Sequence, residues 1–303
     1  MRARRRFLLL AGVVALDVVL VFVALRPRPA SDVAQAVTTA TPSAERSAQS
    51  APRGDTGSTT RPDRALLADV TGATALRVTS AGTCSGGGAA VELSTDEGTS
   101  WTALDLPVEA VFRVRVTGAG SGAVVGAGRD CRPVLYSTED AGASWSGPGT
   151  TDGTWHRYLP AADRLHAPSR DVAVPCGQGV ALVDLAPATV STATILCADG
   201  AIQRTADAGA TWERQGALPG AASINQGSAR TLFAAVSGQD GCAGVGIQTS
   251  TDGGARWTVT GCAADATARD GVALTFTDAD RGLLVTADRA YRTGDGGKVW
   301  AAA

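Results

Sequence analysis

Lysine, tyrosine, histidine and methionine are all scarce in this 303-residue chain. Lys298 is the only lysine among 27 basic residues, and there are three tyrosines, two histidines and one methionine. No phosphate-binding loop, cofactor motif or nucleophile–base pair stands out, so no catalytic or cofactor-binding residue is assigned. There is no C-x-x-C, and neither histidine has ligand spacing to a cysteine, which argues against a metal site. No segment after Leu25 has a helical hydrophobic stripe, so we expect an all-β domain.

The charge of the chain is unevenly distributed. The formal net charge is −2, but residues 1–30 hold six arginines and one acidic residue, Asp17. The other 273 residues carry 21 basic and 28 acidic side chains, a net charge of about −7. Nucleic-acid binding usually requires a basic face that releases condensed counterions. An acidic domain therefore argues against nucleic acid as a partner.

One long hydrophobic run, from Phe7 to Leu25, follows Arg2 and Arg4–Arg6. These 19 residues would span roughly 29 Å as a helix, about the thickness of the hydrocarbon layer. Arginines before the run predict a cytoplasmic N-terminus and an extracytoplasmic remainder. The alternative is a cleaved signal peptide, but its best cleavage site, Ala34–Ala36, lies about ten residues beyond the run. We therefore expect residues 1–25 to form a cytoplasmic tip and a single-pass transmembrane signal anchor in the cell membrane.

Residues 26–64 are rich in Ala, Ser, Thr, Pro and Arg and show no hydrophobic periodicity. Such a segment buries too little apolar surface to offset the entropy lost on ordering. We expect a disordered tether. As a flexible coil, it would span about 35 Å root-mean-square.

Five copies of the motif S/T-x-D-x-G-x-x-W follow the tether. Their Asp, Gly and Trp residues are Asp96, Gly98 and Trp101; Asp140, Gly142 and Trp145; Asp207, Gly209 and Trp212; Asp252, Gly254 and Trp257; and Asp295, Gly297 and Trp300. Ser or Thr precedes the tryptophan in the first three copies, whereas Arg256 and Val299 do so in the last two. The tryptophans are 44, 67, 45 and 43 residues apart. This spacing indicates a repeated structural unit.

Each motif joins two strand-like runs, such as Val134–Tyr136 before the second copy and Ser144-Trp145 after it. The aspartate can accept hydrogen bonds from nearby backbone amides. The glycine provides the positive φ of a tight turn, and the tryptophan packs the hairpin against its neighbour. These residue types predict a structural role for the aspartates, rather than catalysis or calcium binding.

The motif resembles the Asp-box, or BNR repeat, of sialidases, sortilin-type receptors and photosystem II assembly factors. Phe276, Asp278 and Gly282, followed by Tyr291–Thr293, are similar to the repeat of the last of these families. The resemblance implies a β-propeller over residues 65–303, with about 40–50 residues in each four-stranded blade. In the 67-residue interval, a short blade without a motif, beginning near Trp155, would give six blades. Seven is the alternative.

Only three residues follow Trp300, which is too few for a full outer strand. We therefore expect Leu66–Val70 to pair with the last blade and close the ring, because a closed ring leaves no exposed sheet edge.

Six cysteines in an exported domain predict disulfides. In the propeller register, all six lie on the face opposite the Asp-boxes, with Cys262 in a link between blades. The register predicts the pairs Cys84–Cys131, Cys176–Cys197 and Cys242–Cys262.

Asp-box propellers include both enzymes and binding proteins. One hypothesis is a binding or assembly module that recognises a protein or glycan, held near membrane partners by its anchor. Arg113 and Arg115, or Arg129 and Arg132, could contact an acidic partner, but surface arginines are commonly only solvated, and no role is assigned to them.

The other hypothesis is a sialidase-like glycoside hydrolase. Its chemistry requires three arginines on the central channel, a Tyr–Glu pair and an acidic acid/base residue. The tyrosines are Tyr136, Tyr158 and Tyr291, and glutamate is scarce. The Phe/Tyr-Arg-Ile-Pro motif is absent apart from the fragment Arg132-Pro133. His156 and His166 are expected on loops and are left without a role. A binding module is therefore favoured.

Overall fold

A computed structural model describes residues 66–159, 163–228 and 231–303 of the chain. The predicted anchor, residues 1–25, and tether, residues 26–64, lie outside these ranges. Within them, no helix is long and apolar enough to cross a membrane. The described residues form antiparallel sheets, as predicted for an all-β domain.

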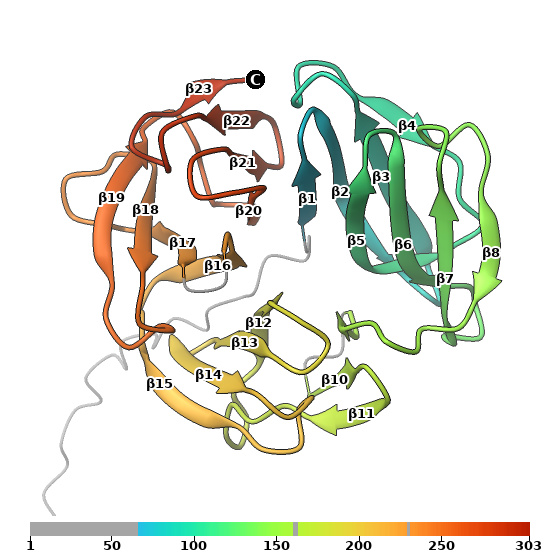
Figure 1. Cartoon of the computed structure of the whole chain (residues 1–303), viewed down its shortest axis with the longest axis horizontal. Helices are drawn as coiled ribbons and strands as arrows, with labels where there is room; N and C mark the ends of the chain where they lie inside the picture. The colour runs from blue at the N-terminus through green and yellow to red at the C-terminus, as the bar shows by residue number, and fades with distance from the viewer. Residues whose placement is uncertain (1–65, 160–162, 229–230) are drawn as a thin grey trace, which may run out of the picture. The chain divides into compact units, whose positions relative to one another are not determined.

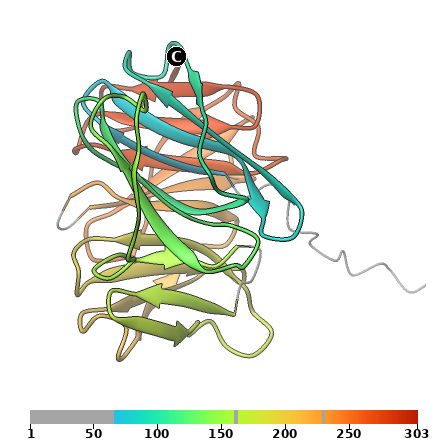
Figure 2. The same cartoon turned by 90° about the vertical axis from the view of Figure 1, so that its right-hand side faces the viewer.

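The first sheet has eight strands in the order β4-β3-β2-β5-β6-β7-β8, with β1 paired to β2. Its strands are β1 (Leu67–Thr71), β2 (Thr74–Thr83), β3 (Gly87–Ser94), β4 (Thr102–Leu104), β5 (Ala110–Gly118), β6 (Ser121–Ala127), β7 (Pro133–Thr138) and β8 (Ser146–Gly149). A single residue pair, Gly82 with Ala110, joins β1–β4 to β5–β8. The sheet therefore consists of two four-stranded meanders whose strands pair at only one corner and whose side chains share a hydrophobic core. Figure 2 shows its long strands from the side.

Four smaller sheets follow in chain order. The second is three-stranded: β9 (His156–Arg157), β10 (Arg164–Ala167) and β11 (Arg170–Ala173). The third comprises β12 (Leu182–Pro187), β13 (Ala193–Cys197), β14 (Ala201–Thr205) and β15 (Glu213–Ala217). The fourth comprises β16 (Ala221–Gln226), β17 (Leu232–Ser237), β18 (Val245–Ser250) and β19 (Thr258–Ala263). The fifth comprises β20 (Val272–Phe276), β21 (Gly282–Thr286), β22 (Ala290–Thr293) and β23 (Ala301–Ala302).

The sheets of residues 66–303 are arranged around a common centre, as in a propeller (Figure 1). Strands β1, β5, β12, β16 and β20 lie nearest to this centre. The short strand β9 contacts both β5 and β12 and continues the inner row. Each inner strand is the first of a meander that runs outward.

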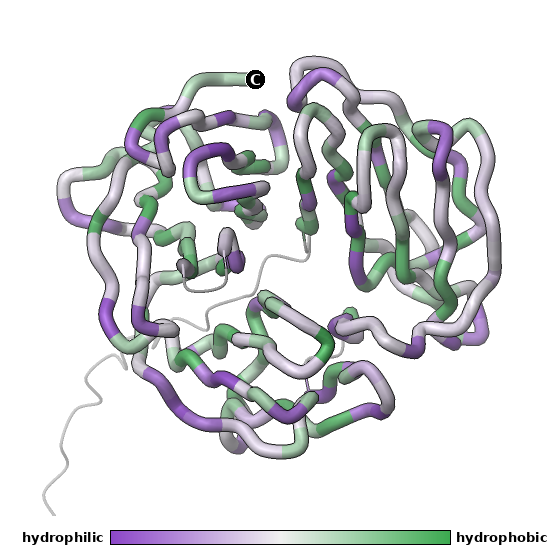
Figure 3. Tube along the Cα trace, viewed as in Figure 1, coloured by the Kyte–Doolittle hydropathy of each residue, from purple (hydrophilic) through white to green (hydrophobic). Residues whose placement is uncertain are grey.

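Hydrophobic layers between neighbouring sheets form the core. Hydrophobic segments lie mainly along the strands, and hydrophilic ones mainly in the loops (Figure 3). Phe233 of β17 stacks on Phe276 of β20 with ring centroids 3.6 Å apart, between the fourth and fifth sheets. Strands such as β17 and β21 are apolar along most of their length because both of their faces are covered. Burial between sheets therefore holds successive meanders together.

The prediction for ring closure is wrong. Strand β1 pairs with β2 as the inner strand of the first meander, and it makes no strand pair with the last sheet. Ala301–Ala302 supply the outer strand of the last sheet by pairing with Tyr291 and Arg292. The two ends of the described region meet through side chains, as Leu66 and Val70 pack against Leu283 and Val285.

Candidate functional site

The five S/T-x-D-x-G-x-x-W motifs form the hairpin turns between the third and fourth strands of their meanders. In the first, the Asp96 carboxylate accepts hydrogen bonds from the Ser100 N–H (2.8 Å) and the Ser100 hydroxyl (2.5 Å). The Ser94 hydroxyl donates to Asp96 (2.7 Å) and accepts from the Gly98 N–H (2.8 Å). The bonds to Asp from the preceding Ser or Thr and from the following amide recur in the other four motifs. The five carboxylates therefore accept hydrogen bonds from groups of their own turns.

The residue before each tryptophan sets the acidity of the aspartate. A hydroxyl at this position, with the backbone amide beside it, lowers the pKa of Asp96, Asp140 and Asp207 to about 2. Arg256 and Val299 offer no hydroxyl. The pKa of Asp252 and Asp295 is lowered first by the amide of this residue and then by the preceding Ser or Thr hydroxyl. All five aspartates therefore remain ionised at neutral pH and bind their turns as anions.

Each motif packs against a neighbouring meander, and the first motif packs against the last one. The Gly142 turn contacts Leu104 of β4, and the Gly254 turn contacts Ile202 of β14. The φ angles of these two glycines, +85° and +99°, are in the region that other residues rarely adopt. Trp101, Trp257 and Trp300 also donate from the indole nitrogen to the carbonyl of the motif glycine, at 2.8–3.2 Å. The glycine contacts join neighbouring sheets, and the indole hydrogen bonds fix the tryptophan within its own turn.

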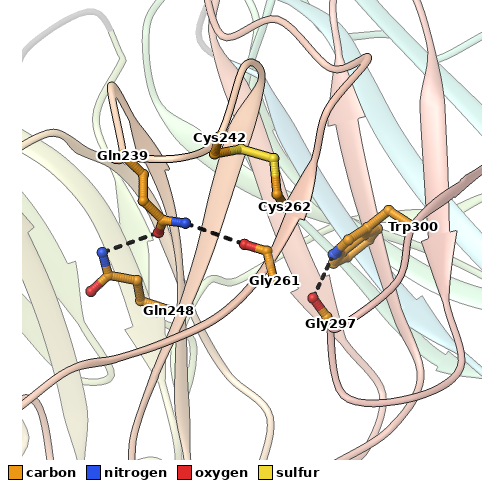
Figure 4. Close-up of a disulfide and its surroundings, with 7 residues drawn as sticks. All are labelled: Gln239, Cys242, Gln248, Gly261, Cys262, Gly297 and Trp300. Atoms are coloured by element: carbon orange, nitrogen blue, oxygen red, sulfur yellow. Dashed lines mark hydrogen bonds between the residues drawn. A yellow bond between two sulfur atoms is a disulfide. The ribbon is translucent and has the colours of Figure 1, made fainter.

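The structure contains the three disulfides predicted from the strand order: Cys84–Cys131, Cys176–Cys197 and Cys242–Cys262. The position expected for Cys262 is wrong, because it lies within the outer strand β19 and not in a link between sheets. Its disulfide ties β19 to the loop between β17 and β18 (Figure 4). Gln239 reinforces this tie by donating to the Gly261 carbonyl (3.4 Å) and accepting from Gln248 (3.2 Å).

A cavity of about 480 Å³ lies at the centre of the sheets. The strands β1, β5, β9, β12, β16 and β20 all contribute to its wall. None of the motif Asp, Gly or Trp residues lines it. The candidate binding site is thus built from the inner strands, which the repeat motif does not include.

Polar side chains link each inner strand to the next around this cavity. Asp69 on β1 accepts a hydrogen bond from the Val116 N–H on β5 (2.8 Å). Arg113 on β5 donates to the Trp155 carbonyl, next to β9 (2.6 Å). Arg157 on β9 donates to a backbone carbonyl of β12.

The same pattern continues through the later strands. Asp184 on β12 accepts from the backbone N–H of Ile224 on β16 (2.9 Å). Asn225 on β16 accepts from the Phe276 N–H on β20 (2.9 Å). The Thr275 hydroxyl on β20 then donates to Asp69 on β1 (3.4 Å). We call this closed circuit of side-chain hydrogen bonds the inner belt.

Three arginines, Arg113, Arg115 and Arg157, line the cavity, together with the acidic residues Asp69 and Asp184. The guanidinium of Arg157 lies 3.5 Å from Asp184. Burial raises the pKa of Asp69, although the Val116 amide and the two nearby arginines act in the opposite direction. Burial also lowers the pKa of Arg113 to about 10; the negative charge of Asp69 opposes this shift, and the positive charge of Arg115 adds to it. The cavity wall is therefore cationic within an acidic domain.

No tyrosine or glutamate is among the described residues that line the cavity. Tyr158 donates its hydroxyl to Asp171 (2.8 Å), and Tyr291 donates to the Asp265 carbonyl (2.8 Å). Three arginines line the cavity, but no Tyr–Glu pair lies beside them among these described residues. Among the described residues, no group of three His, Cys, Asp or Glu side chains is placed to hold a metal ion.

His156 and His166 lie on strands, so the expectation of loops is wrong. They pair across β9 and β10, and their rings stack with centroids 4.5 Å apart. His156 is fully buried, and the Nε2 atoms of both rings have no hydrogen-bond partner. Burial, and then the neighbouring His166, lower the pKa of His156 to about 3. His166 bonds to Asp171 (2.8 Å). The alternating pattern of these two short strands is too brief to be found in the sequence.

A second cavity, of about 470 Å³, lies where the first and last meanders meet. Glu97, Arg281, Arg292 and Val299 are among its lining residues. Arg281 is paired with Asp278 (2.8 Å), and Arg292 lies 3.8 Å from Glu97. Both arginines of this cavity are thus paired with acidic residues of the same chain.

Comparison with known proteins gives structural similarities only. No protein-family model matches the sequence, and no curated protein matches it either. Similar solved structures include YCF48 bound to D1 peptide, with 16% identity over 78% of this chain and 65% of that one, at a TM-score of 0.32. The Hadza microbial sialidase Hz136 is 17% identical over 78% of this chain and 52% of the sialidase, at 0.34. The Aleuria aurantia lectin is 11% identical over 78% of this chain and 94% of the lectin, at 0.47.

Proposed function

We propose that this chain is a membrane-anchored, extracytoplasmic six-bladed β-propeller that binds a protein or glycan partner in its central cavity. The blade count takes β1–β4 and β5–β8 as two blades and the three-stranded sheet β9–β11 as a reduced one. The hydrophobic run of residues 7–25 and the arginines before it support the anchor. The polar composition of residues 26–64 supports the tether.

The observation that carries the binding proposal is the central cavity. Its volume of about 480 Å³ is in the range of ligand-binding sites. Polar groups from all six inner strands converge on it, and the inner belt fixes their positions. A wall of this kind offers a preorganised surface, which reduces the entropy lost on binding.

Site-specific photocrosslinking in the full-length chain tests the proposal. Val190 lines the cavity and is 65% exposed, whereas Val259 is 60% exposed on the outer strand β19. A benzoylphenylalanine at position 190 should give a discrete protein or glycan adduct in native membranes, and one at position 259 should not. Equal labelling at both positions, or none at position 190, would refute a partner in the cavity.

The alternative function is a sialidase-like glycoside hydrolase, which the three cavity arginines favour. The measurement is hydrolysis of a fluorogenic sialoside by the purified chain. The binding proposal expects no turnover above a heat-denatured control. Turnover that is lost in an Arg115→Gln variant would establish the hydrolase instead.

A further inference from the structure

The two histidines of the second sheet lie at its contact with the neighbouring meander. His156 of β9 and His166 of β10 are cross-strand partners, and their rings stack with centroids 4.5 Å apart. Phe112 of β5 also stacks on His156, at 6.1 Å, and the Tyr158 ring meets it edge-on at 5.3 Å. Aromatic rings from both sheets therefore enclose the His156 imidazole.

Both histidine rings present a buried nitrogen without a partner. The Nδ1 atom of His166 lies 2.8 Å from Asp171, and that of His156 lies 3.5 Å from the Thr154 hydroxyl. Among the described residues, neither Nε2 atom has a hydrogen-bond partner. The two ring planes differ by only 21°, so they do not aim both lone pairs at one metal ion. A proton needs only one nitrogen, so it is the ligand that fits this geometry.

The groups around His156 disfavour its cation while β9 is in place. Burial, and then the charge of His166, lower the pKa of His156 to about 3. Asp171 of β11 opposes this shift, and Arg113 of β5 adds to it. Asp171 is already bound to His166 and to the Tyr158 hydroxyl. A buried cation without an acceptor is costly, so protonation favours a state in which His156 reaches water.

Strand β9 has the shortest ladder of the inner strands. It has two residues, whereas β12 and β16 have six each, and only two residue pairs join it to β10. Local opening is easiest where few backbone hydrogen bonds must break. In the inner belt, Arg113 donates to the Trp155 carbonyl next to β9, and Arg157 of β9 donates to β12. Displacement of β9 therefore breaks two consecutive links of the belt.

We propose that protonation of His156 in mild acid releases β9 and so opens the inner belt. The belt is closed at neutral pH, and the open form gains population progressively below about pH 6.5, where an exposed histidine takes up a proton. Arg157 and the residues just before β9 line the central cavity, so the opening alters the wall of the proposed binding site. The effect on a partner rests on the proposed function, whereas the opening itself does not.

Hydrogen exchange with mass spectrometry on the full-length chain in detergent tests the opening. The opening constant of the β9 and β10 amides is obtained at pH 7.5 and pH 5, after correction for the intrinsic exchange rate at each pH. His156 has a pKa of about 3 in the closed form and about 6.5 when exposed, so this constant should be about 30-fold larger at pH 5. The amides of β17, in the fourth sheet, should open less than those of β9 and β10 at both pH values.

Two variants separate the proton from the packing. His156→Phe keeps a ring in the stack and removes the titrating group, so its opening constant should change by less than about 3-fold between the two pH values. Phe112→Leu is the matched control, because it loosens the same contact and leaves both histidines in place. It should open more at both pH values and retain the 30-fold ratio. If His156→Phe does not fold, a pH series on the wild type replaces it, and the opening constant should rise about tenfold per pH unit below pH 6.

Three results would overturn the inference: equal opening at pH 7.5 and pH 5 in the wild type, a 30-fold rise that His156→Phe retains, or β9 and β10 amides that open no more than those of β17. The last result would show that acid unfolds the domain as a whole. Without His156→Phe, a wild-type pH series that lacks the tenfold slope would overturn it equally.

Photocrosslinking at position 190 then connects the opening to binding. An adduct at pH 7.5 that fades at pH 5 in the wild type, but not in His156→Phe, supports control of the cavity by β9. An adduct that persists equally at pH 5 overturns that control and leaves the binding function standing. No adduct at pH 7.5 refutes the binding function, and the exchange data still decide whether acid opens the belt.

Discussion

The buried histidine of β9 makes the stability of the domain sensitive to mild acid. The pKa of His156 in the folded chain is about 3, mainly because of burial, against about 6.5 for an unperturbed histidine. The folded pKa is the lower of the two, so the unfolded chain binds the proton more readily. Stability is therefore complete above about pH 6.5 and is lost progressively as the pH falls towards 3.

The size of this loss follows from proton linkage. Between pH 7.5 and pH 5, the two pKa values correspond to a loss of about 2 kcal/mol in the free energy of unfolding. For a domain of this size, the change lowers Tm by about 4–8 °C. Asp96, Asp140 and Asp207 contribute little in this interval, because both their ordinary pKa of 3.8 and their folded pKa of about 2 lie below pH 5.

Replacing His156 with Phe removes the titrating group and keeps an aromatic ring between Phe112 and His166. Urea unfolding at pH 7.5 and pH 5 should show that the wild type loses about 2 kcal/mol more than His156→Phe. Taking the difference between the two proteins cancels the contribution of distant groups, including Asp69. Other charged groups around the pair are Arg113 from β5 and Asp171 from β11.

Phe112→Leu is the matched control for this comparison. Phe112 stacks on His156, with centroids 6.1 Å apart, so the substitution weakens the same cluster without removing a proton-binding group. It should lower stability equally at both pH values. The reasoning is refuted if His156→Phe loses as much stability between pH 7.5 and pH 5 as the wild type does.

Three further predictions follow from the turns, the disulfides and the inner belt. Thr211→Ala removes the hydroxyl that binds Asp207 at 2.6 Å, so carbon-detected NMR titration should show the pKa of Asp207 rising from about 2; an unchanged value contradicts this assignment. Replacing both Cys242 and Cys262 with Ser should cost about 3 kcal/mol and lower Tm by about 6–12 °C in calorimetry, and an unaltered Tm argues against the bond. Asp69→Ala should lower the free energy of unfolding by about 1–3 kcal/mol and speed hydrogen exchange at the Val116 amide that Asp69 binds. Asp69→Asn keeps an acceptor, so both effects should be smaller. Equal effects of the two substitutions would show that the hydrogen bond is unimportant.

Features with a local cause were predictable from the sequence. The turns of the repeated motif depend on residues within seven positions of one another, and their hydrogen bonds form within that segment. The three cysteine pairs followed once these turns fixed the order of the strands, and all three pairs are confirmed. The placement of Cys262 within β19 was missed because strand ends depend on pairing with a neighbour.

Features that depend on distant segments were not predictable. Leu67–Thr71 has the composition of a strand, but its sequence does not say whether it pairs with β2 or with the last sheet. Local pairing with β2 requires only a tight turn at Gly72, which has a φ of +58°, so its entropic cost is small. The first strand and the last sheet are more than 200 residues apart in the sequence. They are held together by side-chain packing and by the hydrogen bonds of the inner belt.

The inner belt also explains why the candidate site could not be read from a motif. Each inner strand must hold its neighbour without a shared ladder of backbone bonds, so its polar side chains act as links. Arg115 lines the same cavity but takes no part in the belt. The side chains that line the cavity are therefore brought together only when every inner strand is in place.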